Sequence, residues 1–568
     1  MCVRGRERLM QELEEFTVKN LGPHGICPDN CNLCEAFPST KERFQRIVER
    51  WNWRKCRIGW REFVQSSQLT NHEICHKMFR HALEGCPALE GCSKMYIQVK
   101  DLRHDQEREM AFYHQSAGED RVVTLSCSLL TTQMLDYDTM MFEAMSDEQD
   151  MEYREAAQRF YRPYLFSYVM ELDEKKYDAL RKLQEIVAEE SRWENNESDP
   201  YLWLACTFTP DSESSNISLD GYVVQSASRI SKIKAPLYIK IEDPTTSRRM
   251  AKSILDVYKL NPSCLKDDPS FIQRLQKKLG HDRLSTIDVY NVGNGNCVYA
   301  QGKNGDMSFF YDIGFHYRHR PKTIVPGKLY SYVESMKRIY AQKPSFFILS
   351  HWDMDHIAGS AAARKDFLDQ DWFAPDCWDA CADAKRLARY LDLKDHLLLA
   401  KRPASGMPGG RCIGKVDVMS SAASPQILAT YQFYMGEKAR CDSSLPNCEG
   451  IVIEYTDRIT GVRVLMMGDV NYASFNRARL ANHHLGFADT PIDYLIAPHH
   501  GSERTDYRKI TDGKTPINGR LAILCCTNRP GENRPNQGHK DELKKRFGDN
   551  VRTTDEAPPN NHYIRIRL

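Results

Sequence analysis

The spacing of apolar residues changes near residue 280. Before that point, segments 6–20 and 174–193 repeat apolar residues at a period near 3.6, which predicts amphipathic helices. Segments 201–209 and 235–243 are short and rich in β-branched and aromatic residues, which predicts strands. We therefore expect residues 1–280 to form an N-terminal domain of mixed α/β structure that is mainly helical.

Short apolar runs separated by Gly, Asn and Asp recur from residue 283 onward and predict strands. Charged segments at 330–342 and 539–547 predict helices between them. Strand pairs joined by tight turns, with helices between them, favour two sheets packed face to face and covered by helices. The expected fold class is α+β, with a second domain over residues 283–568. The predicted strands fall at 285–293, 296–302, 307–315, 345–351, 450–457, 463–470, 493–500, 521–527 and 562–568.

Length and composition bound the class of protein. The 568 residues exceed the roughly 250–300 at which a single core stops growing, so we expect about two or three domains. Lys and Arg number 78 against 77 Asp and Glu, so a nucleic-acid substrate would need local basic patches instead of an overall basic field. We find no apolar run long enough for a membrane helix and no signal-peptide core. We therefore expect a cytoplasmic protein with no membrane contact, in which most of the 19 cysteines are reduced.

Polar side chains of metal-ligand type collect where the predicted strands end. In "FFILSHWDMDHIAGS" (346–360), four such residues fall within six positions. Alternate residues of an extended segment point the same way, so three of them could project into one pocket, with the fourth following at the bend. The residues at these strand ends are Asp312, His351, Asp353, Asp355, His356, Asp469, His499 and His500.

Imidazole and carboxylate donors in this mixture suit Zn(II), Mn(II) or Fe(II). Two such metals, bridged by a carboxylate and a hydroxide, are a common device for hydrolysing phosphoesters or amides. The alternative is a hydrogen-bonded surface turn. The density of donors after several apolar strands favours the metal site.

The motifs resemble the metallo-β-lactamase superfamily, whose signature is His-x-His-x-Asp-His, with Asp353 in place of the second histidine. This variant looks like the hydrolase domain of ComEC-type DNA-uptake proteins. The resemblance covers about residues 283–568 and implies an αββα sandwich. It is carried by "IDVYNVGNGNCVYA", "FYDIGF", "NCEGIVIEY", "VLMMGDV", "IAPHHGS", "NRPNQGHKDEL" and "VRTTDE", which keep the order of that branch.

The resemblance implies a role for each donor. His351 and Asp353 would hold the first metal, and Asp355 and His356 the second. Asp469 would bridge the two metals. His499, or in its place His500, would complete the second site. We expect two Zn(II) or Mn(II) ions in this domain.

The sequence leaves further roles open. Asn447, Cys448 and Glu449 are the candidates for a third ligand to the first metal, and Cys448 could equally be a packing residue. Asp355 could instead act as a base toward the metal-bound water. The resemblance places His539 near the site, where it would protonate a leaving group or bind a phosphate. Asp312 and Gly314 would shape a turn.

Two groups outside the cluster offer weaker signals. Arg318, Arg320 and Lys322 follow a predicted strand and would form a phosphate-binding loop or a solvated face. Cys27, Cys31 and Cys34 have the spacing Cys-x3-Cys-x2-Cys, which fits a structural zinc or iron–sulfur knuckle, or ordinary reduced cysteines.

The leading functional hypothesis is a metal-dependent phosphodiesterase or nuclease acting on DNA or RNA, in which a metal-bridging hydroxide attacks in line. A second hypothesis is hydrolysis of an amide, a lactone or a small nucleotide at the same site, because the fold does not fix the substrate. A third is a sensing protein, in which residues 1–280 bind a protein partner and the hydrolase domain is the effector, as in a bacterial defence system.

Overall fold

The computed structural model describes residues 94–103, 123–149, 151–161, 163 and 166–172, strands between residues 202 and 241, and most of 256–568. Within these residues, no helix is both long and apolar enough to cross a membrane. The longer gaps in the last range are 316–334, 402–409, 437–449, 484–490, 511–518 and 527–534.

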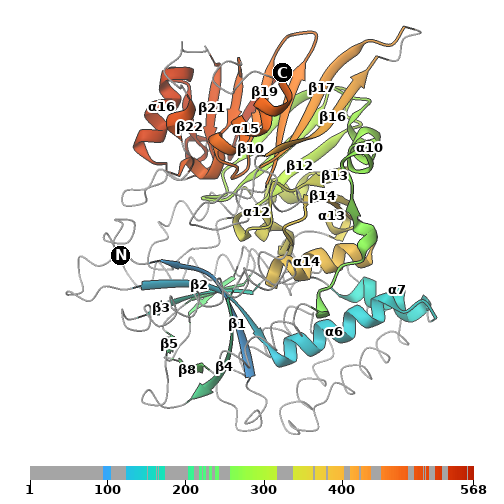
Figure 1. Cartoon of the computed structure of the whole chain (residues 1–568), viewed down its shortest axis with the longest axis vertical. Helices are drawn as coiled ribbons and strands as arrows, with labels where there is room; N and C mark the ends of the chain where they lie inside the picture. The colour runs from blue at the N-terminus through green and yellow to red at the C-terminus, as the bar shows by residue number, and fades with distance from the viewer. Residues whose placement is uncertain are drawn as a thin grey trace.

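The described part of the N-terminal region contains an antiparallel sheet, whose strands are coloured blue to green in Figure 1. Its strand order is β5-β8-β4-β1-β2-β3-β6-β7. Helix α6 (Thr132–Ser146) follows β2 directly, and α7 (Met151–Phe160) comes next in the chain. The strands are β1 (Lys94–Arg103), β2 (Val123–Thr131), β3 (Phe166–Leu172), β4 (Leu202–Thr209), β5 (Ile217–Leu219), β6 (Tyr222–Gln225), β7 (Arg229–Lys232) and β8 (Leu237–Ile241).

This region contains more strand than the sequence pattern predicted. Strands β4 and β8 confirm the predictions at 201–209 and 235–243. The helices predicted at 6–20 and 174–193 lie outside the described residues. Their helical character therefore stays a prediction.

Two mixed sheets make up the C-terminal half. The first has the order β23-β10-β11-β12-β13-β14-β15-β9 and changes from antiparallel to parallel pairing after β12. The second has the order β16-β17-β18-β19-β20-β21-β22 and changes to parallel pairing after β19. Parallel strands in both sheets therefore end toward the loops that carry the ligand-type residues.

The strands of the first sheet are β9 (Leu265–Lys266), β10 (Leu284–Tyr290), β11 (Cys297–Gly302), β12 (Ser308–Ile313), β13 (Phe346–Ile348), β14 (Asp371–Pro375), β15 (Leu397–Ala400) and β23 (Tyr563–Arg567). Those of the second are β16 (Arg411–Met419), β17 (Ile427–Met435), β18 (Ile451–Asp457), β19 (Arg463–Met466), β20 (Tyr494–Ile496), β21 (Leu521–Leu524) and β22 (Val551–Thr553). Each of the nine predicted strand segments overlaps one of these strands. Strands β9, β14 to β17 and β22 were not predicted.

Side chains of the two sheets meet in one apolar core. Successive residues of a strand point to opposite faces, so Phe433 and Ile453 enter this core while Tyr434 and Val452 lie on the outer face of the second sheet. Helices α15 (Tyr472–His483) and α16 (Gln537–Phe547) cover that outer face.

The outer face of the first sheet is aromatic. The ring of Phe347 stacks on Trp372 at 4.2 Å between centroids and on Phe310 at 5.7 Å. Phe367 of α13 (Lys365–Leu368) packs against Phe347. Helices therefore lie outside both sheets, which is the αββα arrangement predicted for residues 283–568 (Figure 1).

Helix α10 (Asp268–Leu279) precedes residue 280 and yet belongs to the sandwich. Asp267 caps it by accepting a hydrogen bond from the Ser270 amide at 3.0 Å, and a proline follows in the first turn. Phe271 and Leu275 enter the core between the sheets. With β9, which pairs with β15, this helix extends the sandwich to about residue 265.

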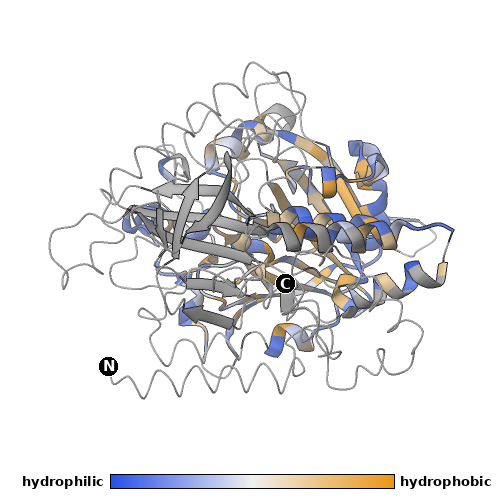
Figure 2. Cartoon of the chain, turned by 90° about the horizontal axis from the view of Figure 1, so that it is seen from below, coloured by the Kyte–Doolittle hydropathy of each residue, from blue (hydrophilic) through white to orange (hydrophobic). Residues whose placement is uncertain are grey.

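A buried ion pair joins the N-terminal region to the sandwich. Arg386 of α14 (Ala382–Leu393) donates from Nε to Asp138 of α6 at 2.8 Å, and from Nη1 to Asp383 at 3.2 Å. The hydroxyls of Tyr161 and Tyr258 donate to the same Asp138 carboxylate at 2.7 and 2.6 Å. In Figure 1, α14 lies between the sandwich and helices α6 and α7. Figure 2 shows hydrophobic and hydrophilic residues alternating along the described helices, as expected where one face is packed.

Removing the arginine of this pair should destabilise the protein strongly. Arg386→Leu leaves Asp138 and Asp383 buried without their cation, and breaking a buried pair costs about 3–5 kcal/mol. The free energy of unfolding of the protein, measured by urea denaturation, checks this. Lys415→Leu, which removes the exposed partner of Asp417, should cost at most about 1 kcal/mol. Equal losses in the two variants would contradict a stabilising role for the buried pair.

Candidate metal centre

Loops at the ends of β13, β19 and β20 bring the ligand-type residues together. His351 follows β13, and Asp355 and His356 lie on the short helix α12 (Met354–Ile357). Asp469 follows β19, and the His499–His500 pair follows β20. The segment after His351 was expected to be extended through Asp355, but the helix begins directly after Asp353, which has extended backbone. The donors therefore come from both sheets of the sandwich.

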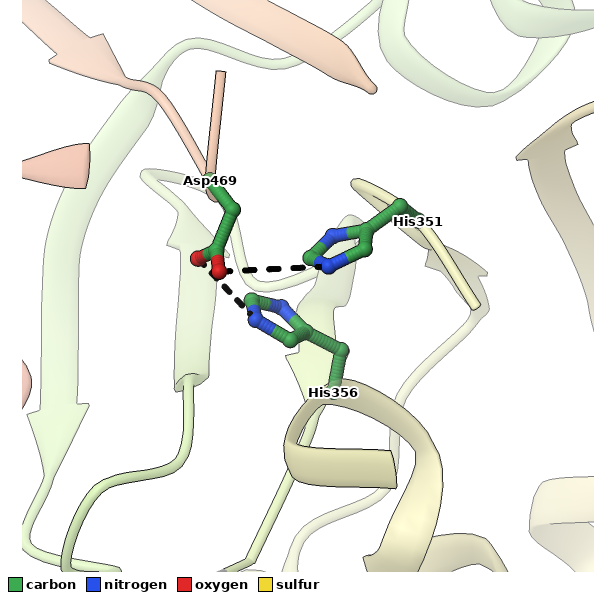
Figure 3. Close-up of side chains that lie close together, drawn as sticks. All are labelled: His351, His356 and Asp469. Atoms are coloured by element: carbon green, nitrogen blue, oxygen red, sulfur yellow. Dashed lines mark ion pairs between the residues drawn. The ribbon is translucent and has the colours of Figure 1, made fainter. Parts of the chain in front are cut away.

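The first donor group consists of His351, His356 and Asp469 (Figure 3). Asp469 Oδ1 lies 3.1 Å from His356 Nε2, and Asp469 Oδ2 lies 4.0 Å from His351 Nε2. One donor atom from each residue lies within 4.8 Å of the others, and all three residues are buried. Asp353 adds a half-exposed carboxylate 3.7 Å from His351 Nε2.

The second donor group consists of Asp355, His356 and His500. His500 Nε2 lies 3.3 Å from Asp355 Oδ2 and 3.8 Å from Asp469 Oδ1. The Asp469 carboxylate is thus within about 4 Å of histidine nitrogens from both groups. His499 lies beside it, with Nδ1 3.7 Å from Asp469 Oδ2. Of the two neighbouring histidines, His500 is the one grouped with Asp355 and His356.

Hydrogen bonds at Nδ1 orient the three buried histidine rings. His356 Nδ1 donates to Asp312 at 2.8 Å, and His500 Nδ1 donates to the carbonyl of Cys525 at 2.9 Å. His351 Nδ1 lies 3.0 Å from the hydroxyl of Ser350, whose own hydrogen goes to Asp312 at 2.7 Å. Each ring therefore carries its hydrogen on Nδ1 and faces the cluster with Nε2.

The Nε2 atoms of these three rings are buried and receive no hydrogen bond. Buried polar atoms normally have partners, and a histidine that donates from one nitrogen commonly ligates a metal through the other. Three such lone pairs beside two carboxylates fit a divalent transition metal. The residues present therefore match the cofactor expected from the motifs.

The charges of the cluster also favour a cation. Burial alone would raise the pKa of Asp355 and of Asp469, but the surrounding histidines hold both pKa values well below their usual range. Burial would lower the pKa of His356, but Asp469 and Asp312 on its two sides raise it well above the usual value. A metal at Nε2 would take the place of that proton, since metal binding releases protons from its ligands.

The backbone at the site is strained. Asp312, His499 and His500 have φ of 62°, 50° and 53°, which is the left-handed region that side chains disfavour. Each such residue costs of order 1–3 kcal/mol and persists where the surrounding structure fixes it. Gly468 also has positive φ, and a Cβ there would lie 2.3 Å from Ser350 Cβ, so only glycine fits immediately before Asp469.

His539 lies on α16 with both ring nitrogens engaged. Nδ1 lies 3.2 Å from the Ser502 carbonyl, and Nε2 lies 3.1 Å from the Tyr472 hydroxyl. Burial lowers its pKa to about 4, so the ring is neutral near pH 7. These contacts are those of a residue that supports the loop after His500, and they give no support to a role in protonating a leaving group.

The remaining predicted residues lie outside the described part of the chain. These are the basic residues Arg318, Arg320 and Lys322, the candidates Asn447, Cys448 and Glu449, and the cysteines Cys27, Cys31 and Cys34.

Several residues behind the donors were not predicted from the sequence. Ser350, Asn296 and Cys525 all contact Asp312 or its neighbours, and Asp312, expected only to shape a turn, contacts His356 directly. The adjacency of Ser350 to His351 was a usable signal. Nothing local marks Asn296 or Cys525, because their contacts join distant parts of the chain.

No family model and no curated protein matches the chain. Among solved structures, unliganded yeast PDE1 is 11% identical, covering 50% of this chain and 99% of that one, with a TM-score of 0.28. A diphosphatase from the PhnP family is 10% identical over 50% and 98%, with a TM-score of 0.27. A mutant of the CmlA β-hydroxylase is 12% identical over 76% and 91%, with a TM-score of 0.28. The chemistry of the site is therefore inferred from its own residues.

Replacing Asp469 by Asn keeps its volume and removes its charge. We expect Asp469→Asn to remain folded, to bind at least one metal more weakly, and to lose a factor of roughly a hundred or more in turnover, as when charge stabilisation is removed at a reacting centre. Circular dichroism, metal analysis and turnover on the same preparation check this.

Asp457→Asn is the matched control, because Asp457 is also buried but pairs with Arg283 away from the cluster. It should lower stability and leave the metal content intact. Wild-type turnover with full metal content in Asp469→Asn would exclude a bridging role.

Proposed function

We propose that this protein is a metal-dependent hydrolase that cleaves phosphodiester bonds, with nucleic acid as its substrate. The observation that carries the proposal is the pair of donor groups that share His356, whose histidine Nε2 atoms lie within about 4 Å of the Asp469 carboxylate. The order His351-x-Asp353-x-Asp355-His356, with its resemblance to the ComEC-type branch of the metallo-β-lactamase superfamily, supports the phosphodiester substrate.

Two Zn(II) or Mn(II) ions would be held by this cluster. His351 and Asp353 would hold one, and Asp355, His356 and His500 the other, with Asp469 between them. When bound, such a pair supplies positive charge to the scissile group and a nucleophilic water near neutral pH.

The protein residues do the positioning. Asp312 and the Cys525 carbonyl fix the rings of His356 and His500, and the Ser350 hydroxyl fixes that of His351. Asp355 lies inside the second donor group, which favours a ligand role over that of a free base. The burial of the cluster keeps its charges in a low-dielectric site, where they act more strongly than in water.

Metal analysis of the purified full-length protein tests the cofactor. We expect one to two equivalents of zinc or manganese per chain, lost largely in the double variant Asp355→Ala with His356→Ala, which removes two of the three donors of one group. Exhaustive chelation should abolish cleavage of labelled single- or double-stranded DNA or RNA, and added Mn(II) or Zn(II) should restore it. A chelated, metal-free protein with full activity would refute the proposal.

Charge reversal tests the substrate. If Arg318, Arg320 and Lys322 bind phosphates, changing all three to Glu should raise KM for nucleic acid. It should also weaken the salt dependence of binding. The slope of the logarithm of the binding constant against the logarithm of the salt concentration should fall by roughly 0.7–0.9 for each phosphate that the loop no longer neutralises. Lys415→Glu, at an exposed position on β16, is the control and should change neither quantity. An unchanged rate and salt response in the triple variant would show that the loop is a solvated face.

A further inference from the structure

Asn296 is a buried residue just before β11 that forms hydrogen bonds to three separate segments. Its backbone N–H donates to the carbonyl of Asp355 at 2.9 Å. Its side-chain amide donates to Asp312 Oδ2 at 2.7 Å, and its amide oxygen accepts a hydrogen bond from the Cys525 thiol at 3.1 Å. It is only 3% exposed, so water does not compete for these bonds.

Each of these three bonds connects Asn296 to one donor of the second group. The connection to Asp355 is direct, through the Asp355 carbonyl. His356 is reached through Asp312, which accepts from His356 Nδ1 at 2.8 Å. His500 is reached through Cys525, whose carbonyl accepts from His500 Nδ1 at 2.9 Å. His351 of the first group lies one hydrogen bond further away, behind Ser350 and Asp312.

We infer that Asn296 is a positioning residue for one of the two metal positions, the one lined by Asp355, His356 and His500, and that Cys525 is its partner on the other sheet. This inference rests on the proposed metal-dependent function. An amide suits the place because it can donate to Asp312 and accept from Cys525 at the same time. Aspartate would lose the donor and add a second carboxylate beside Asp312, and alanine would lose both bonds.

The packing around Asn296 leaves little room for adjustment. Gly314 lies between Asn296 and Asp355, and a Cβ on Gly314 would be 1.7 Å from the Asp355 carbonyl and 2.7 Å from that of Asn296. The Gly314 amide donates to the Asn296 carbonyl at 2.7 Å. A change at Asn296 should therefore be transmitted to Asp355 and His356 instead of being absorbed locally.

Zinc titration of the metal-depleted, full-length protein against a chromophoric chelator tests this, with Co(II) absorption spectra as a second readout. Wild type should bind two equivalents. Asn296→Ala and Asn296→Asp should weaken one of them by about 10–100-fold, as for other residues that support metal ligands, and leave the other unchanged. The Co(II) spectrum of the weakened position should change as well.

Cys525 supplies an independent arm, which remains informative if the Asn296 variants do not fold. Cys525→Ala removes the donor to Asn296 and should weaken the same equivalent. Cys525→Ser keeps a hydrogen-bond donor and should restore wild-type binding. Cys526→Ala is the matched control, because the buried side chain of Cys526 packs in the apolar cluster under α15 and α16. It should lower stability without changing zinc affinity.

The outcomes separate this inference from the proposed function. If wild type binds no zinc or cobalt, the proposed function fails and the inference with it. If wild type binds a single equivalent, the metal centre stands and the inference, which needs two positions, is overturned. If wild type binds two equivalents and Asn296→Ala and Cys525→Ala keep both affinities and the same Co(II) spectrum, the metal centre stands and the inference is overturned. Equal weakening of both equivalents in these variants would also overturn it.

Discussion

The buried carboxylate of Asp312 is the constraint on which the arrangement of the site depends. It is fully buried, and a carboxylate in that position must be satisfied by donors. Four donors surround it: the amide and hydroxyl of Ser350 at 2.6 and 2.7 Å, the Asn296 side chain at 2.7 Å and His356 Nδ1 at 2.8 Å. Satisfying this one group fixes the residue before His351, the ring of His356 and the loop before β11. The left-handed backbone of Asp312 is held in place by the same contacts.

Helix α14 connects the site to the N-terminal region. It contacts α6 and β2 on one side and α12, which carries Asp355 and His356, on the other. Its Arg386 pairs in the interior with Asp138 of α6, which ties α14 to that helix. A movement of α6 or β2 against the sandwich would therefore be passed through α14 to α12, which carries Asp355 and His356. The sensing role considered for residues 1–280 would need a route of this kind.

Local sequence pattern was sufficient for part of the fold and for the donors that the structure brings together. Short apolar runs identified strands such as β13, β19 and β20, and the donors at their ends, because a buried strand and the residue that follows it are adjacent in the chain. Strands β9, β14 to β17 and β22 were missed. β16, "RCIGKVDVM", mixes charged and apolar residues because only one of its faces is buried. Asn296 and Cys525 could not be found in this way, since 229 residues separate them and only the packing of the two sheets brings them together.

The position of the donors on both sheets has a consequence for stability. His351, Asp355 and His356 belong to the first layer, and Asp469, His499 and His500 belong to the second. A cation held by donors of both layers is therefore a cross-link between them. A ligand that binds only the folded state stabilises it by an amount that grows with its free concentration, about 2.7 kcal/mol at a hundredfold excess over Kd. The apolar core already joins the sheets, so the sandwich can assemble first and be closed at this edge afterwards. The supply of metal in the cell would then control how long the folded protein survives, as well as whether its site is loaded.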